Sequence, residues 1–209
     1  WSTLVSIELG MPSDTISGAV MARFISSFKE GRLRAAKVYD LEQNRLEGNV
    51  EEFTERLHRG YDAFRIINHA IGFSVLREAA NDYSWDLNLP EIARIWTNGC
   101  IIRSRLMEQL VGWMDELEER SLLEHPKIVD RLKRQLKSMS AVCAEGLENG
   151  YSLPVSTAAL NYFLGYIRGQ LPANLIQAQR DYFGAHTYQR VDRDAEEYFH
   201  TNWKSDSYD

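Results

Sequence analysis

EEFTERLHRGYDAFRIINHAIGFSVLREAANDY, the stretch from Glu51 to Tyr83, carries the strongest helical pattern in the chain. Its apolar residues recur every three or four positions, which places them on one face of an α-helix. This face is marked by Phe53, Leu57, Tyr61, Phe64, Ile67, Ile71, Val75 and Ala79. Because Ile66, Ala70 and Phe73 widen the apolar face, we expect a long central helix that is buried on more than one side.

The same spacing continues on both sides of this stretch. Each proline in the chain opens a segment of this kind, and proline suits the first position of a helix because it has no N–H to leave unpaired. No run of alternating apolar and polar residues favours a strand. We therefore expect an all-α, multi-helix domain. Its other helices are expected at Ser2–Leu9, Pro12 to about Val38, Pro90–Trp96, Ile101 to about Leu117, Pro126–Leu147, Leu153–Arg168 and Pro172–Gly184.

A faint internal repeat accompanies these helices. PSDT at Pro12–Thr15 recurs as PVST at Pro154–Thr157, and a Glu-x-Gly triplet precedes each copy, at Glu8–Gly10 and Glu148–Gly150. Four-residue patterns match easily by chance, so the repeat is compatible with an internal helical duplication but does not establish one.

Composition limits the classes of function. The chain has 209 residues, of which 44% are hydrophobic, so it can bury a real core and is not a disordered protein. Its net charge of −6 lacks the basic footprint of a nucleic-acid-binding protein. The average field also repels anions, so an anionic ligand would need a local cluster of basic residues.

Cysteines and histidines give no sign of a metal site. Cys100 and Cys143 lack CxxC spacing and indicate buried thiols in a reducing compartment, so we expect a cytoplasmic protein. The histidines outside the candidate site lack metal-ligand spacing and are expected to be structural: His58, His69, His125 and His200. No apolar run reaches the roughly 18 residues that a membrane span needs, and the first residues lack the features of a signal peptide.

Candidate ligand-binding residues lie in LPANLIQAQRDYFGAHTY, at Leu171–Tyr188. Gly184 is expected to end a helix in the left-handed conformation. Arg180 lies about one turn before that end, and His186 follows two residues after it. A guanidinium and an imidazole at such a turn suit a phosphorylated or carboxylated ligand. Equally, Arg180 could face the helix dipole and His186 could complete a hydrogen bond.

Arg23 is a third candidate. Its helical neighbours are the small residues Ala19, Ala22, Ser26 and Ser27, which leave room for a phosphate beside its guanidinium. An ion pair with the nearby Glu30 is the alternative, and the residues alone do not decide between the two.

Several segments resemble one enzyme family. QAQRDYFGAHTY (Gln177–Tyr188) closely resembles the C-terminal signature of the decarboxylating 6-phosphogluconate dehydrogenases, and HTNW (His200–Trp203) continues the match. WTNGCIIRS (Trp96–Ser104) and ARFISSFKEGR (Ala22–Arg32) resemble two further family segments. One departure is Thr97–Asn98–Gly99, where the family usually has Arg-Gly-Gly or similar. There we expect Asn98 to keep the turn, since asparagine tolerates the left-handed conformation.

The resemblance implies a metal-independent enzyme of the pentose phosphate pathway that oxidises 6-phosphogluconate with NADP and releases carbon dioxide to give ribulose 5-phosphate. It also implies that Arg23 and Arg180 contact the substrate phosphate, and that His186 hydrogen-bonds substrate oxygens. Arg180 and His186 would be donated across a homodimer. Residues 1–188 would then form a helical substrate and dimerisation domain, and 189–209 a tail packed on the partner subunit.

The resemblance places the family's catalytic Lys and Glu, and its NADP-binding domain, in sequence that precedes Trp1. We therefore expect a fragment that has no catalytic residues of its own and is inactive alone. Its residues do not decide whether the enzyme prefers NADP or NAD. A non-catalytic helical oligomerisation module and a related 3-hydroxy-acid dehydrogenase domain remain as alternatives.

Overall fold

The computed structural model describes residues 1–45, 48–117 and 120–203, so the last six residues of the expected tail lie outside the described part. The chain divides into two compact units, Trp1–Leu164 and a second unit that begins at Gly165. The regular elements in the described residues are helices, which confirms the all-α prediction. None of the described helices combines the length and the apolarity that crossing a bilayer requires. The expected role of residues 189–209 on a partner stays a prediction.

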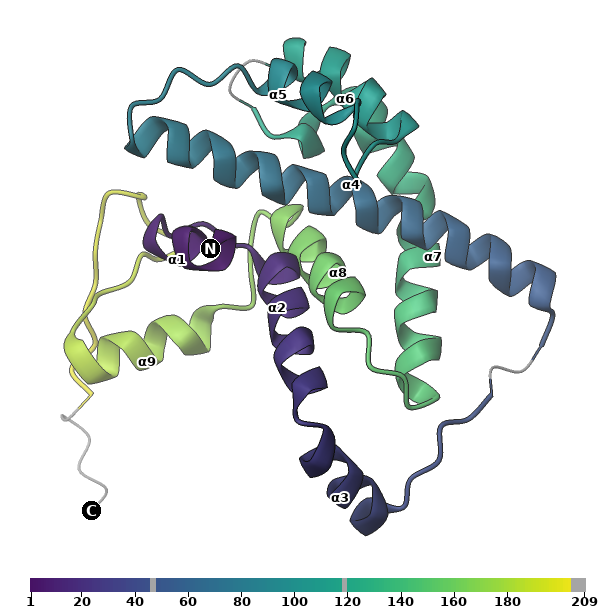
Figure 1. The fold of residues 1–209 in the computed structure, drawn as a ribbon. Helices are drawn as coiled ribbons and strands as arrows, with labels where there is room; N and C mark the ends of the chain where they lie inside the picture. The colour runs from purple at the N-terminus through teal and green to yellow at the C-terminus, as the bar shows by residue number, and fades with distance from the viewer. Residues whose placement is uncertain (46–47, 118–119, 204–209) are drawn as a thin grey trace. The chain divides into compact units, whose positions relative to one another are not determined.

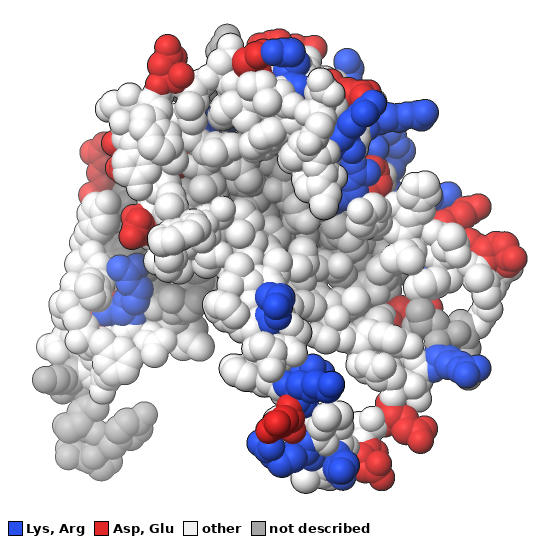
Figure 2. Space-filling model, in the orientation of Figure 1, with Lys and Arg blue, Asp and Glu red and all other residues white. Residues whose placement is uncertain are grey.

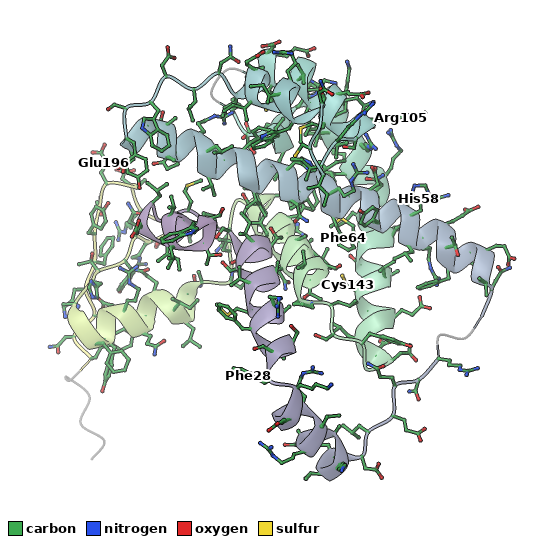
Figure 3. All side chains as sticks on the ribbon, in the orientation of Figure 1. Phe28, His58, Phe64, Arg105, Cys143 and Glu196 are labelled. Atoms are coloured by element: carbon green, nitrogen blue, oxygen red, sulfur yellow. The ribbon has the colours of Figure 1, made fainter. Side chains whose placement is uncertain are left out.

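The long central helix of the first unit is α4, Val50–Asp82, and it crosses α7, Pro126–Glu148 (Figure 1). The side chain of Asn49 begins α4 by accepting hydrogen bonds from the N–H groups of Glu51 and Glu52. Phe64 of α4 and Cys143 of α7, both labelled in Figure 3, belong to the buried core that joins the two helices. The predicted burial is therefore confirmed from Phe64 to Ala79, whereas it was wrong for Leu57 (42% exposed) and Tyr61 (58% exposed) in the first part of the helix.

Two ion pairs fix α4 against α7. Arg56 contacts Glu145 at 2.7 Å. Arg131 donates two hydrogen bonds to Asp62, at 2.7 and 2.5 Å. Because a bidentate arginine contact is directional, these pairs set the register of two helices whose apolar contacts alone would permit sliding.

The helices α5 (Leu89–Trp96) and α6 (Arg105–Asp115) pack on each other, and the short 3₁₀ helix η1 (Leu122–Glu124) contacts α4 and α7. The helix expected to start at Ile101 begins only at Arg105, because the Ser104 side chain caps it by accepting from the N–H of Met107 at 3.2 Å. The expected turn before it is kept, but its left-handed residue is Gly99 (φ 75°) and not Asn98.

The helix expected from Pro12 to Val38 is two helices, α2 (Asp14–Ser27) and α3 (Lys29–Tyr39). The chain breaks at Phe28, labelled at the junction in Figure 3, which has φ −79° and ψ 48°. The Arg32 side chain donates to the carbonyl oxygens of Ser26 (3.0 Å) and Ile25 (3.2 Å) at the end of α2, where Ile25 also accepts from the Phe28 N–H at 3.1 Å. The nearest glycine, Gly31, does not mark the break and lies within α3.

Charged side chains gather over α3, at the lower end of the space-filling view (Figure 2). None of its residues is buried. Beside this charge lies exposed apolar surface: Phe24 (56% exposed), Phe28 (65%) and Leu33 (55%).

Prolines mark the other helix starts to within two residues. Pro126 opens α7, Pro154 opens α8 (Pro154–Tyr166), and Pro90 is the second residue of α5. α2 and α9 (Asn174–Gly184) begin two residues after their prolines.

The faint repeat has a structural counterpart. α1 (Ser2–Glu8) and α7 both end in a turn whose glycine is left-handed, Gly10 at φ 66° and Gly150 at φ 80°. In both turns the next N–H bonds back five residues, from Met11 to Ser6 at 2.8 Å and from Tyr151 to Gly146 at 2.9 Å. This pairing is the Schellman helix ending. The two helix–turn–helix units thus share their turn as well as their sequence pattern, which supports the duplication.

Candidate functional site

A pocket of about 710 Å³ lies within the second unit, between α9 and the segment that follows it. Both candidate residues of this unit, Arg180 and His186, line it. Arg190 lines it too, but is held by Asp192 through two hydrogen bonds of 2.8 and 2.7 Å. Within the described part of the chain, the ion pairs do not include Arg180. The structure therefore brings an uncommitted guanidinium and an imidazole together on one cavity.

The end of α9 differs from the prediction in one detail. Gly184 is still helical, and the left-handed residue is Ala185, at φ 50°. The N–H of Ala185 closes the helix by donating to the carbonyl oxygen of Asp181 at 2.9 Å. Gly184 is required for another reason: a Cβ on it would lie 2.8 Å from Nε2 of His186. The glycine makes room for the imidazole rather than for a turn.

Asp181 is the residue that the sequence reasoning missed. Its side chain is fully buried, and four donors surround its carboxylate. Oδ1 accepts from the Thr187 N–H at 3.0 Å and from His200 Nδ1 at 2.9 Å. Oδ2 accepts from the Thr201 N–H at 3.0 Å and from Trp203 Nε1 at 2.9 Å. The sequence feature that could have pointed to Asp181 is the match to HTNW at residues 200–203, because this segment supplies three of the four donors.

The pKa of the Asp181 carboxyl reflects two opposing effects. Burial raises this pKa, because the charged form loses water. The hydrogen bonds from His200, Thr201 and Trp203 favour the charged form and outweigh burial, so the pKa lies well below its ordinary value. Asp181 is therefore a carboxylate at neutral pH.

The segment after His186 folds back onto α9 of its own chain. Tyr188 and Phe199 exchange backbone hydrogen bonds of 2.9 and 2.8 Å as an isolated antiparallel bridge. Gln177 of α9 donates to the Thr187 carbonyl oxygen at 2.5 Å. Trp203 thus has a partner within its own unit, whereas Tyr198 remains 67% exposed. Packing of these aromatic residues on a partner subunit stays a prediction.

The apolar face expected on α9 is present but exposed. Leu175 is 80% exposed, Ile176 62% and Phe183 75%. The only buried residue of this helix is Asp181. Such an apolar stripe on the outside of a folded unit is typical of an interaction surface.

Arg23 belongs to the first unit, on α2. It is exposed, and its Nη1 donates to Ser26 Oγ at 3.1 Å. The alternative ion pair with Glu30 does not occur among the described residues. The phosphate role of Arg23 stays a prediction.

Three of the histidines expected to be structural have local partners. His125 is buried, contacts Glu116 at 3.0 Å and stacks on Trp113. His69 contacts the Arg65 carbonyl oxygen at 2.7 Å, and burial lowers its pKa. His200 binds Asp181. The described residues hold no group of three or more His, Cys, Asp or Glu side chains that could bind a metal ion.

Fold and site together define an all-α domain with a basic pocket beside its last helix. Residues 1–203 match the family described as 6-phosphogluconate dehydrogenase, C-terminal domain, and the chain belongs to this family. It is 41% identical over 207 residues to the decarboxylating 6-phosphogluconate dehydrogenase of Escherichia coli, covering 97% of this chain and 43% of that protein. The Staphylococcus epidermidis enzyme is 40% identical over 204 residues, with the same coverage.

A solved structure shows the same fold. The 6-phosphogluconate dehydrogenase of Plasmodium falciparum, described in its apo form, with its cofactor NADP⁺ and with its substrate 6-phosphogluconate, has a TM-score of 0.90 at 33% identity. The match covers 97% of this chain and 44% of that one. The chain therefore spans less than half the length of the relatives it matches.

Acidification should release the tail only at low pH. Because the pKa of Asp181 is lower in the folded state, its contribution to stability is full above the ordinary value of 3.8 and is lost as the pH falls through the lowered value. We expect the indole N–H resonance of Trp203 to stay constant from neutral pH down to about 3.8 and to shift below it. In Asp181→Asn the shifted resonance should already appear at neutral pH. A transition of this resonance near neutral pH that is also present in His200→Ala, which removes the imidazole from the same carboxylate, would contradict the assignment.

Gly184→Ala should move His186 without unfolding the helix. Alanine favours a helix over glycine by up to about 1 kcal/mol, and the added Cβ meets only the end of the His186 side chain. We expect an unchanged or slightly raised free energy of unfolding, together with a displaced imidazole resonance in NMR spectra. Gly169→Ala, where a Cβ meets nothing within 4 Å, is the matched control and should leave that resonance in place.

Proposed function

We propose that this chain forms the C-terminal domain of a cytoplasmic, NADP-dependent, decarboxylating 6-phosphogluconate dehydrogenase, and that its share of the work is to bind substrate and to dimerise. Family membership and the relatives' activity support the reaction. The observation that carries the binding role is the convergence of Arg180 and His186 on one pocket.

Arg180 suits the phosphate group. A guanidinium can donate two parallel N–H bonds to phosphate oxygens, and Arg180 has no competing carboxylate among the described ion pairs. The imidazole of His186 then donates to substrate oxygens from the same cavity. Both groups bind and orient the substrate, and neither removes the proton. We also assign phosphate binding to Arg23, which belongs to the first unit.

The residues of this chain do not fit the cofactor. NADP, when bound, accepts the hydride from the substrate, and its pyrophosphate is usually held by a glycine-rich turn between a strand and a helix. The described residues contain no strand of this kind and the sequence contains no GxGxxG. We therefore assign NADP binding and the proton transfers to other parts of the enzyme.

The exposed apolar surfaces support a homodimer. Large hydrophobic side chains lie exposed on the surface of each unit: Leu175, Ile176 and Phe183 on α9 of the second unit, and Phe24 and Phe28 beside α3 of the first. A second copy that covers them would place the pocket of one subunit at the interface. We propose that Arg180 and His186 complete the partner's substrate site in this way.

Arg180→Ala should weaken substrate binding. Loss of a charged bidentate contact costs about 2 kcal/mol, which raises the Kd for 6-phosphogluconate about 30-fold. Calorimetry on the full-length enzyme measures this change, with Arg193→Ala, an exposed arginine of the same unit outside the pocket, as control. Equal affinity of wild type and Arg180→Ala would favour the non-catalytic oligomerisation module.

The 209 residues alone should give no turnover, because we assign hydride-acceptor binding and proton transfer to other parts of the enzyme. A fluorescence assay of NADPH formation with 6-phosphogluconate should show signal for the full-length enzyme and none for residues 1–209. A substrate-dependent signal from residues 1–209 would refute this division of labour.

A further inference from the structure

We infer that Asp181 is a positioning residue of the substrate site, whose buried carboxylate holds the chain on both sides of the pocket so that His186 presents its nitrogens to the substrate beside Arg180. This inference rests on the proposed function of those two residues. It assigns to Asp181 a role in substrate affinity beyond that of stabilising the fold.

Burial makes the carboxylate an unusual feature. It is the one buried residue of α9, a helix whose apolar residues are exposed. A buried ionised group is tolerated only where its oxygens are paired. An apolar residue at this position would leave all four donors without their acceptor and could not direct them to defined positions. The carboxylate is therefore better explained by the geometry that it imposes than by stability alone.

The carboxylate holds two different segments, and His200, which belongs to the second of them, also binds Oδ1. Oδ1 binds the Thr187 N–H, so it fixes the peptide group that directly follows His186. Oδ2 binds the Thr201 N–H and the Trp203 indole, so it fixes the returning end of the tail. Trp203 and Thr201 line the same pocket as His186. One side chain thus ties α9 to both chain segments that form the cavity.

The backbone around His186 provides independent support. Both of its neighbours have positive φ, Ala185 at 50° and Thr187 at 59°. A β-branched residue rarely adopts this conformation, and such strain persists only where the surroundings impose it. Three hydrogen bonds hold Thr187: its N–H to Asp181, its carbonyl oxygen from Gln177 and its hydroxyl to the His186 carbonyl oxygen. Strain of this kind is expected next to a residue whose side chain has to point in one direction.

Asp181→Asn tests the inference in the full-length enzyme. The amide keeps the size of the side chain but replaces one acceptor oxygen by a donor, so two of the four donors lose their partner in either orientation. We expect the KM for 6-phosphogluconate to rise about tenfold or more, with the KM for NADP within about twofold of wild type. Asp194→Asn makes the same chemical change at an exposed position of the tail and should leave both constants unchanged.

A double-mutant cycle with His186→Ala separates positioning from a structural role. If Asp181 acts through His186, the effect of Asp181→Asn on the substrate KM should largely disappear in the His186→Ala background. A purely structural role would lower the melting temperature and the active fraction. It would then either leave the substrate KM unchanged or raise the substrate KM by the same factor in both backgrounds. Either of the last two results overturns the inference.

A milder variant covers the case in which Asp181→Asn fails to fold. His200→Ala removes one donor, whose side chain is 49% exposed, and leaves the carboxylate buried. It should raise the substrate KM by a smaller factor in the same direction, and an unchanged KM in a folded His200→Ala enzyme would then overturn the inference.

A substrate-independent measurement distinguishes failure of the inference from failure of the proposed function. A wild-type enzyme without 6-phosphogluconate-dependent activity would refute the proposed function. In that case, a displaced His186 imidazole resonance and weaker binding of inorganic phosphate by Asp181→Asn would still support positioning, and unchanged values would overturn it.

Discussion

A single buried carboxylate determines the arrangement of the second unit. Asp181 accepts hydrogen bonds from four donors that lie six to twenty-two residues further along the chain. Because an ionised group without water depends on every one of its partners, loss of one donor weakens the hold on the others. The end of α9, the turn at His186 and the returning tail therefore behave as one cooperative element. The position of the candidate ligand-binding groups follows from this constraint.

The first unit is held together differently. There, a long apolar face of α4 is buried against α7, and directional ion pairs such as Arg131–Asp62 set the register. Apolar burial supplies most of the stability of such a unit but specifies position weakly. The second unit has little buried apolar surface, and specifies position through hydrogen bonds to one acceptor group. A site that must orient two polar side chains benefits from the more directional of these two kinds of interaction.

Sequence reasoning succeeded where the determining interactions are local. The bounds of α4 were predicted to within one residue at each end, because the apolar period lies within the segment itself and the residue that caps it, Asn49, directly precedes it. The break at Phe28 was missed because neither proline nor glycine marks it, and it depends on Arg32 reaching back to Ile25. Asp181 was missed for the same reason. A helical period assigns it to a polar face, and the donors that bury it lie mainly near the end of the chain.

The electrostatics of the pocket explain why the carboxylate of Asp181 is buried and paired whereas the guanidinium of Arg180 is exposed. The chain carries a net charge of −6, so a phosphorylated ligand gains nothing from the average field and depends on charges within a screening length of about 8 Å. An exposed carboxylate beside Arg180 would compete with the ligand for its guanidinium. Asp181 avoids this because its two oxygens are both occupied by donors and its side chain is fully buried. Arg180, its neighbour in sequence, stays exposed on the pocket. The negative charge therefore organises the chain without neutralising the positive charge that an anionic ligand would meet.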